Sequence, residues 1–381
     1  MNRVAVEPRM LLWARERADR SVESLRRGFP RLAEWESGAV QPTLKQLEGF
    51  AKAVHVPVGY LFLQQPPEEP VPIPDFRTLA DRPARRPSPD LLDTVYLCQQ
   101  RQDWYREFAR QVGEEPLSFP GSARVGDDVV RTAAGMREAL GFDIDVRRKT
   151  PTWTDALRRF IEQADALGVL VMVSGIVGSN NRRKLDPEEF RGFALADALA
   201  PLVFVNGADT KAAQMLTLAH ELAHIWLGAT ALSDARAAEV PAQAVERWCN
   251  QVAAELLVPM DAFRATHERH FELRGELDRL ARHFKVSTLV VLRRMHDAGT
   301  LRGAAYWEAY EEELRRLRAV AGGGGGDFYL TLGARAGRRF ARALVISTLE
   351  GRSSFTEAFR LLGFRKMATF RELGQSLGVG F

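Results

Sequence analysis

One stretch of the chain restricts its possible folds more than any other, the run His220-Glu221-Leu-Ala-His224 within residues 210–227. Apolar residues recur through this segment with the 3.6-residue period of an α-helix, and we predict a helix with Asp209 as its N-cap. Histidines four positions apart lie on one helix face, so both imidazoles can bind one metal ion. Glu221 lies beside them, where it can accept a proton from an attacking water instead of binding the metal.

The alternative for this motif is a pair of core histidines whose hydrogen bonds are satisfied locally. Only about 0.01 chance occurrences are expected in a chain of this length and composition. A chance occurrence would also seldom fall on a periodic helix. The motif therefore favours a catalytic zinc site.

A catalytic zinc site has three protein ligands and one open position, so a further ligand must lie downstream of the motif. The candidates are acids and histidines: Asp234, Glu239, Glu246, Glu255, His267, His270 and His283. Periodicity predicts a helix over 242–257, and Glu246 flanks its buried stripe, where an acid needs a partner. The alternative for Glu246 is a surface glutamate that pairs with Arg247.

Two linker-like segments divide the chain. The segment 65–74 holds five prolines, which favour an extended connector, and a run of five glycines at 322–326 is typical of a flexible linker. We therefore predict an N-terminal helical domain at 1–64, a proline-rich linker at 65–89, a central domain at 90–321, the glycine linker at 322–326 and a basic helical domain at 327–381.

The N-terminal block has the pattern of five short helices, with Ser21 and Thr43 as N-caps. The run from Trp35 to Gly38, followed by Pro42 and Thr43, resembles the phage-repressor (Cro/C1, or XRE-type) helix-turn-helix family over about 60 residues. The block departs from that family in a shortened turn before the recognition helix.

The helix-turn-helix resemblance implies binding to double-stranded DNA through residues 1–64. Arg31 and Glu34 are the candidates for reading bases, and Arg26 and Arg27 are suited to phosphates. The alternative is a helical bundle kept for protein contacts or dimerisation.

A second resemblance covers roughly residues 150–300. The segments that carry it are Phe193, Val203–Asn206, Leu216–Gly228, Glu246–Asn250 and Ala253–Pro259. They resemble the ImmA/IrrE family of metallopeptidases, which cleave helix-turn-helix repressors and so relieve transcription of stress or mobile-element genes. The resemblance implies that His220, His224 and Glu246 bind Zn²⁺ and that Glu221 is the general base.

Together these observations predict a helix-rich α+β protein. It would have a five-helix helix-turn-helix bundle, a zincin-like peptidase domain with a small sheet and an active-site helix, and a small helical C-terminal domain. The predicted function is a zinc endopeptidase that cleaves a helix-turn-helix repressor or a toxin-system partner and so regulates phage, mobile-element, toxin-linked or stress genes. The alternative is a non-proteolytic DNA-binding regulator or antitoxin with a structural or vestigial zinc site, although a structural site has no need of Glu221.

Three further segments have a predicted structure and a predicted role in binding or packing. The segments 193–195 and 202–205 are predicted strands that would offer a sheet edge to an extended substrate. Residues 280–295 resemble a second helix-turn-helix, but a helical cap on the peptidase core is the favoured interpretation. The C-terminal block predicts an amphipathic helix with Arg335, Arg338, Arg339 and Arg342 on a basic face. We expect that face to be solvated, with nucleic acid or an acidic protein as the alternative partner.

Composition indicates the charge distribution, the redox state of the cysteines and the expected cellular location. The net charge of +4 is uneven, because residues 327–381 hold nine Lys/Arg against four Asp/Glu. The two cysteines, Cys98 and Cys249, form no metal-binding or redox motif and are predicted to be reduced core thiols. The longest apolar run, 167–177, is too short to span a bilayer, and the first residues lack a signal peptide. We expect a cytoplasmic protein with no membrane partner.

Overall fold

The computed structural model describes residues 3–75, 86–232, 243–268, 272–320 and 328–380. The chain divides into two compact units. The first comprises Met1–Pro72 and Arg85–Val95, and the second comprises Ile73–Ala84 and Tyr96–Phe381. The predicted glycine linker at 322–326 lies outside the described residues.

The first unit contains five short helical segments around an aromatic core. They are α1 (Pro8–Arg17), α2 (Val22–Leu25), α3 (Leu32–Glu36), α4 (Leu44–Ala53) and the 3₁₀ segment η1 (Val58–Phe62). Trp35 and Phe50 are buried and meet edge to face. Ser21 and Thr43 cap α2 and α4 as predicted, and Thr43 forms a capping box with Gln46. The helical pattern is confirmed, while DNA binding by this unit stays a prediction.

The second unit is built on a four-stranded mixed sheet of order β1-β3-β2-β4. The strands are β1 (Leu170–Ser174), β2 (Gly192–Leu195), β3 (Leu202–Asn206) and β4 (Ala231–Leu232). β3 runs parallel to β1 and antiparallel to β2, and β4 pairs antiparallel with β2. The expected substrate edge at 193–195 and 202–205 is therefore wrong, because both strands have a neighbour on each side.

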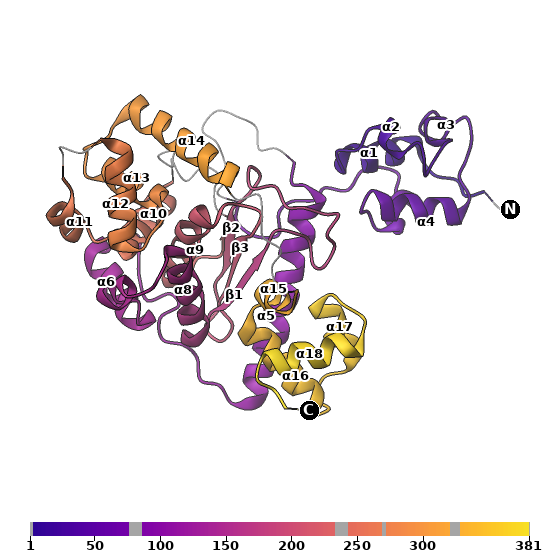
Figure 1. The fold of residues 1–381 in the computed structure, drawn as a ribbon. Coiled ribbons are helices and arrows are strands. Elements are labelled where there is room, and N and C mark those ends of the chain that lie inside the picture. Colours follow the sequence, from indigo (N-terminus) through magenta and orange to yellow (C-terminus); the bar gives the residue numbers. More distant parts are fainter. Residues whose placement is uncertain (1–2, 76–85, 233–242, 269–271, 321–327, 381) are drawn as a thin grey trace. The chain divides into compact units, whose positions relative to one another are not determined.

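Helices cover the sheet and extend the unit (Figure 1). Their bounds are α5 (Pro89–Val112), α6 (Val129–Leu140), α7 (Ile144–Arg148), α8 (Trp153–Leu167), α9 (Lys211–Leu227), α10 (Ala244–Leu257), α11 (Met260–Thr266), α12 (Leu273–Phe284), α13 (Thr288–Asp297), α14 (Gly303–Val320), α15 (Phe328–Ala336), α16 (Arg338–Leu349), α17 (Phe355–Leu362) and α18 (Met367–Ser376).

The two faces of the sheet pack against different layers, because side chains alternate along a strand. Val171 and Val203 face the main hydrophobic core, which also contains the apolar residues of α8, α9 and α10. Met172, the next residue of β1 and the register partner of Phe204, contacts Cys98 and Arg101 of α5 on the opposite face. The sheet is thus the middle layer between the helix that carries the metal-binding motif and α5.

The C-terminal helices pack onto this second unit. The guanidinium of Arg101 is buried and donates to the main-chain oxygens of Leu361 and Arg335, at 3.0 and 2.9 Å. Gly337 has φ 79°, and a Cβ at this position would lie 3.0 Å from the carbonyl oxygen of Val171 in β1. The start of α16 can therefore approach the edge of the sheet closely only with glycine here.

Candidate metal centre

The predicted motif lies on α9, which is buried on nearly every side. Thr210 is the N-cap, accepting from the Ala213 amide at 3.2 Å, so the prediction of Asp209 as N-cap is wrong by one residue. Gly228 ends the helix in the left-handed conformation, φ 67°. A helix enclosed by the sheet and other helices can hold polar side chains only where they have partners. The polar side chains of the motif must therefore have hydrogen-bonding or ionic partners within the protein.

The third predicted ligand lies on α10, the helix packed most extensively against α9. Glu246 is in the first turn of α10, and its side chain is 2% exposed. Asn250 follows one turn later on the same face and is also buried. The pairing of α9 with α10 therefore brings the two motif histidines and two polar side chains of α10 into one buried cluster.

The geometry of this cluster suits a metal ion. Nε2 of His220 and Nε2 of His224 are 3.1 Å apart. The Glu246 carboxylate lies 3.2 Å from the first nitrogen and 3.0 Å from the second. At zinc–ligand bonds of about 2.1 Å, tetrahedral ligand atoms lie about 3.4 Å apart. Among the described residues, these three form a group of potential metal ligands whose atoms all lie within 4.8 Å of one another.

Asn250 fixes the orientation of the first imidazole. Its Oδ1 lies 3.0 Å from Nδ1 of His220, so the Nδ1–H donates to the amide oxygen and Nε2 keeps its lone pair. That lone pair faces the second imidazole and the carboxylate. Three electron-rich groups this close in a buried site repel one another unless a cation lies between them. The residues present therefore fit a divalent cation.

The electrostatics of the cluster agree with this assignment. Burial disfavours charge on His220, but the Glu246 carboxylate outweighs it and raises the pKa of His220. Burial lowers the pKa of His224. Burial also opposes ionisation of Glu246, yet the two imidazoles hold the pKa of its carboxyl well below its usual range. Glu246 is therefore anionic, the form in which a carboxylate binds a metal.

Glu221 lies beside the cluster and is fully buried. Its carboxylate approaches β2 at Gly192, where a Cβ would lie 3.0 Å from Oε1 of Glu221 and 2.8 Å from the carbonyl oxygen of Phe204. A side chain at Gly192 would displace the carboxylate or the sheet, so glycine is required there. This role was not predictable from the sequence, because strand β2 and helix α9 meet only in the folded chain.

Those of the other candidate ligands that the structure describes do not join the cluster. His267 contacts Glu276, with Nδ1 and Oε1 3.0 Å apart, and His283 contacts Arg148. Glu255 forms a buried ion pair with Arg294. Asp234, Glu239 and His270 lie outside the described residues, so the structure compares Glu246 only with the remaining candidates.

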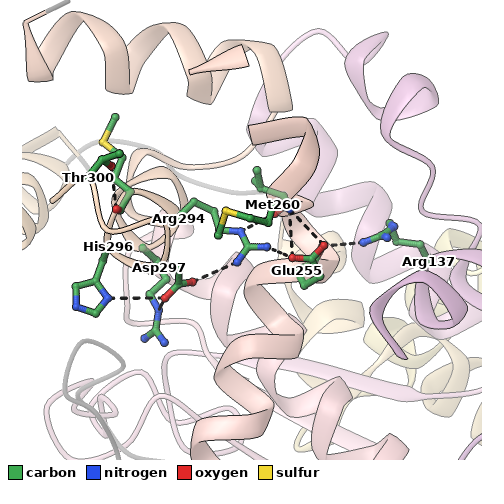
Figure 2. A network of polar contacts seen from close by, with 10 residues as sticks. Arg137, Glu255, Met260, Arg294, His296, Asp297 and Thr300 are labelled. Carbon is green, nitrogen blue, oxygen red and sulfur yellow. Dashed lines mark hydrogen bonds and ion pairs between the residues drawn. The ribbon is translucent and has the colours of Figure 1, made fainter. Parts of the chain in front are cut away.

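Arg294 is the centre of a polar network that ties three helices together (Figure 2). Its Nε donates to the main-chain oxygen of Val258 at 2.6 Å, and its Nη1 lies 3.3 Å from Asp297. The Glu255 carboxylate also accepts from the amide of Met260 at the start of α11. A buried arginine satisfied in this way is part of the packing, which favours the helical-cap interpretation of residues 280–295.

The candidate DNA-binding residues lie in the first unit. Arg26 and Arg27 are exposed, and Arg26 lies 3.6 Å from Glu23. Arg31 and Glu34 form an ion pair with each other at 2.6 Å, both 46% exposed. The two predicted base-reading side chains are therefore partners in this structure, and an exposed pair of this kind is weak enough to exchange partners.

Comparison with protein families supports a metallopeptidase-type domain in the part of the chain that carries the metal-binding cluster. Residues 164–296, about a third of the chain, match the family described as the IrrE N-terminal-like domain, a peptidase family. This segment includes β1 to β4 and both helices that carry the cluster. Residues 336–376 match a domain of unknown function (DUF8813). No curated protein and no solved structure matches the chain. None of the helices in the described parts of the chain is long and apolar enough to cross a membrane.

Proposed function

We propose that the protein is a zinc-dependent endopeptidase that cleaves a helix-turn-helix repressor or a toxin-system partner and so controls transcription. The observation that carries the catalytic part is the buried cluster of two imidazoles and one carboxylate with Glu221 beside it. Two nitrogen ligands and one oxygen ligand are typical of catalytic zinc sites in peptidases. The match of residues 164–296 to a peptidase family supports the same reaction class.

The chain's own residues supply the proton transfers. Bound zinc would provide a Lewis acid that polarises the scissile carbonyl and makes water more acidic. Glu221 accepts the proton of the attacking water on its carboxylate and then donates it to the leaving amine. Gly192 leaves room for that carboxylate, and Asn250 holds His220 in the tautomer that presents Nε2 to the metal.

The choice of substrate rests on the domain arrangement. The N-terminal block has a repressor-like sequence and five helical segments, and we propose that residues 1–64 bind double-stranded DNA near the substrate's own operator. Arg26 and Arg27 are exposed and suited to phosphate contacts. A peptidase held at an operator would meet a DNA-bound repressor at high local concentration.

Cleavage of a candidate repressor, encoded beside this gene, tests the proposal. Purified wild-type protein with zinc should cut the repressor, and Glu221→Gln should lower the rate by roughly 10²–10⁴, the usual effect of losing a general base. The matched control is Glu138→Gln, an exposed glutamate on α6, which should cut at the wild-type rate. Equal cutting by wild type and Glu221→Gln, with equal zinc content, would show that Glu221 is not the base.

A further inference from the structure

The C-terminal part of the second unit contains a three-helix arrangement that the metal centre does not use. The helices α16, α17 and α18 enclose the buried side chains of Phe340, Leu344, Leu361 and Leu373. Phe370 of α18 is also buried, and its ring lies 5.4 Å from Phe355 and 6.0 Å from Phe359 of α17. The aromatic contacts hold α17 and α18 against each other over the first helix.

The order and lengths of these helices are those of a helix-turn-helix. The eight-residue helix α17, capped by Ser354, is followed by a four-residue turn at 363–366 and then by the ten-residue helix α18. The turn begins with Gly363 in the left-handed conformation, φ 80°. A helix-turn-helix that binds DNA places its second helix in the major groove, with the N-terminal residues of that helix nearest the bases.

The second helix, α18, presents a polar face to solvent. The exposed positions are Met367, Ala368, Arg371, Glu372, Gln375 and Ser376. Arg371 and Gln375 are four positions apart and therefore project from the same side of the helix. Arginine and glutamine are the side chains that read guanine and adenine through paired hydrogen bonds. Arg371 lies in the second turn of α18, near the end of the helix that would face the bases, whereas Gln375 lies in the last turn.

Positive charge surrounds the beginning of that helix. Residues 336–376 hold eight Lys/Arg and three Asp/Glu. Arg365 and Lys366, in the turn directly before α18, are both exposed. Because they precede the helix, they lie where phosphates flank a major groove.

A second basic segment lies beside the same turn. The loop between β1 and β2 carries the run Ser179-Asn-Asn-Arg182-Arg-Lys184, in which Arg182 and Lys184 are exposed. A Cβ at Gly363 would lie 2.8 Å from Oγ of Ser179, so the loop and the turn are in contact. Loop and turn together line a hollow whose walls are hydroxyl, amide and guanidinium groups. The loop that carries Arg182 therefore contacts the start of the turn that carries Arg365 and Lys366.

We propose that the turn at 363–366, helix α18 and the loop at 179–184 form a second DNA-binding surface, whose occupant is a DNA duplex. The charge is complementary to phosphate, and the polar exposed face of α18 suits base edges. Of the large apolar side chains, that face exposes only Met367, whereas the centre of a protein interface is usually built on aromatic anchors. The proposal requires neither zinc binding nor DNA binding by residues 1–64.

The test measures binding of the full-length protein to a labelled duplex by fluorescence anisotropy at several salt concentrations. The probes are a duplex of random sequence and one from the gene's own promoter. Arg365→Glu with Lys366→Glu should weaken binding at least tenfold at low salt and lower the slope of log affinity against log salt by about 1.8, since each lost phosphate contact accounts for about 0.9. Glutamate near a helix N-terminus does not oppose the helix dipole, so α18 should stay folded.

The matched control reverses two exposed arginines elsewhere, Arg131→Glu with Arg158→Glu, so the change in net charge is the same. It should bind like wild type. If the glutamate variant loses helical circular dichroism, Arg365→Ala with Lys366→Ala should still lower the slope. Binding by the C-terminal variants equal to that of the control would overturn the proposal, as would no duplex binding by the wild-type protein.

A third variant separates this surface from the N-terminal block. Arg26→Ala with Arg27→Ala removes the predicted phosphate contacts of residues 1–64 and leaves the C-terminal surface intact. The proposal requires that this variant still binds the duplex and that Arg365→Glu with Lys366→Glu weakens the binding that remains. Complete loss of duplex binding in the N-terminal variant alone would assign all DNA contact to residues 1–64 and overturn the inference.

Discussion

Replacing Asn250 with alanine tests how the protein prepares its histidines for a metal. In the structure, Oδ1 of Asn250 lies 3.0 Å from Nδ1 of His220, and both side chains are less than 10% exposed. Asn250→Ala removes the acceptor that fixes the tautomer and ring orientation of His220. Loss of such an outer partner usually weakens metal binding 10–100-fold, which corresponds to about 1.4–2.7 kcal/mol.

The assay for Asn250→Ala is a competition titration of zinc against a chromophoric chelator. Gln251→Ala is the matched control, because Gln251 is the next residue of α10 and is exposed. Asn250→Asp should keep wild-type affinity or exceed it, since a carboxylate accepts the same hydrogen bond more strongly. If Asn250→Ala binds zinc within twofold of Gln251→Ala, the amide does not orient the ligand and this reasoning fails.

Three other changes have defined outcomes. Arg294→Met should lower the free energy of unfolding in urea by roughly 3–5 kcal/mol, because it leaves Glu255 buried without its ion pair. Adding Glu255→Gln should recover part of that loss. An unchanged urea midpoint in Arg294→Met would contradict this prediction. Burial raises the pKa of Asp165 from 3.8 to about 6, so the folded state keeps a proton that the unfolded state loses between these pH values. Stability should therefore fall by up to about 3 kcal/mol as pH rises through that window, and urea unfolding of Asp165→Asn should show a flatter pH profile. Gly192→Ala should slow repressor cleavage more than tenfold, because its Cβ would lie 2.8 Å from the carbonyl oxygen of Phe204 and 3.0 Å from Oε1 of Glu221, and an unaltered rate would show that both contacts are tolerated.

The grouping of the two motif histidines was predictable because its information is local. Histidines four apart on a periodic helix must share a face, and the structure places His220 and His224 as that spacing requires. Glu246 was chosen from the periodicity of its own helix and from family resemblance, and it lies within 3.2 Å of both imidazoles. Each of these inferences needs only one helix and the chemistry of zinc ligands.

The parts that were missed depend on contacts between distant segments. Strands β2 and β3 were predicted from their composition, but their interior place depends on β1 and β4, which lie on either side of them in the sheet. Gly192 lies against Glu221 across the sheet–helix interface, and the periodicity of apolar residues along the sequence does not predict a contact of this kind. The N-cap moved from Asp209 to Thr210 because both residue types cap helices well and only the path of the chain selects one.

The basic C-terminal segment shows the same limit. The prediction of one helix with four arginines on its basic face is wrong, because Arg335 lies on α15 and the other three lie on α16, which begins after Gly337. Arg339 was expected on a solvated face, yet its guanidinium donates to the Tyr105 hydroxyl at 2.7 Å and pairs with Glu114 of the segment after α5. Arg338 and Arg342 are exposed as expected. An amphipathic pattern gives the two faces of a helix, but it does not show which cations of the polar face reach a distant acid.

The central claim is that His220, His224 and Glu246 hold one zinc ion, and metal content measured by elemental analysis tests it most directly. The wild-type protein, purified with zinc and then dialysed, should retain about one zinc per chain. Glu246→Ala should lose most of it, while Asp234→Ala and Glu239→Ala, the rival acids, should retain it. Zinc retained by Glu246→Ala but lost from Glu239→Ala or Asp234→Ala would contradict the assignment, and sub-stoichiometric zinc in the wild-type protein would contradict the site itself.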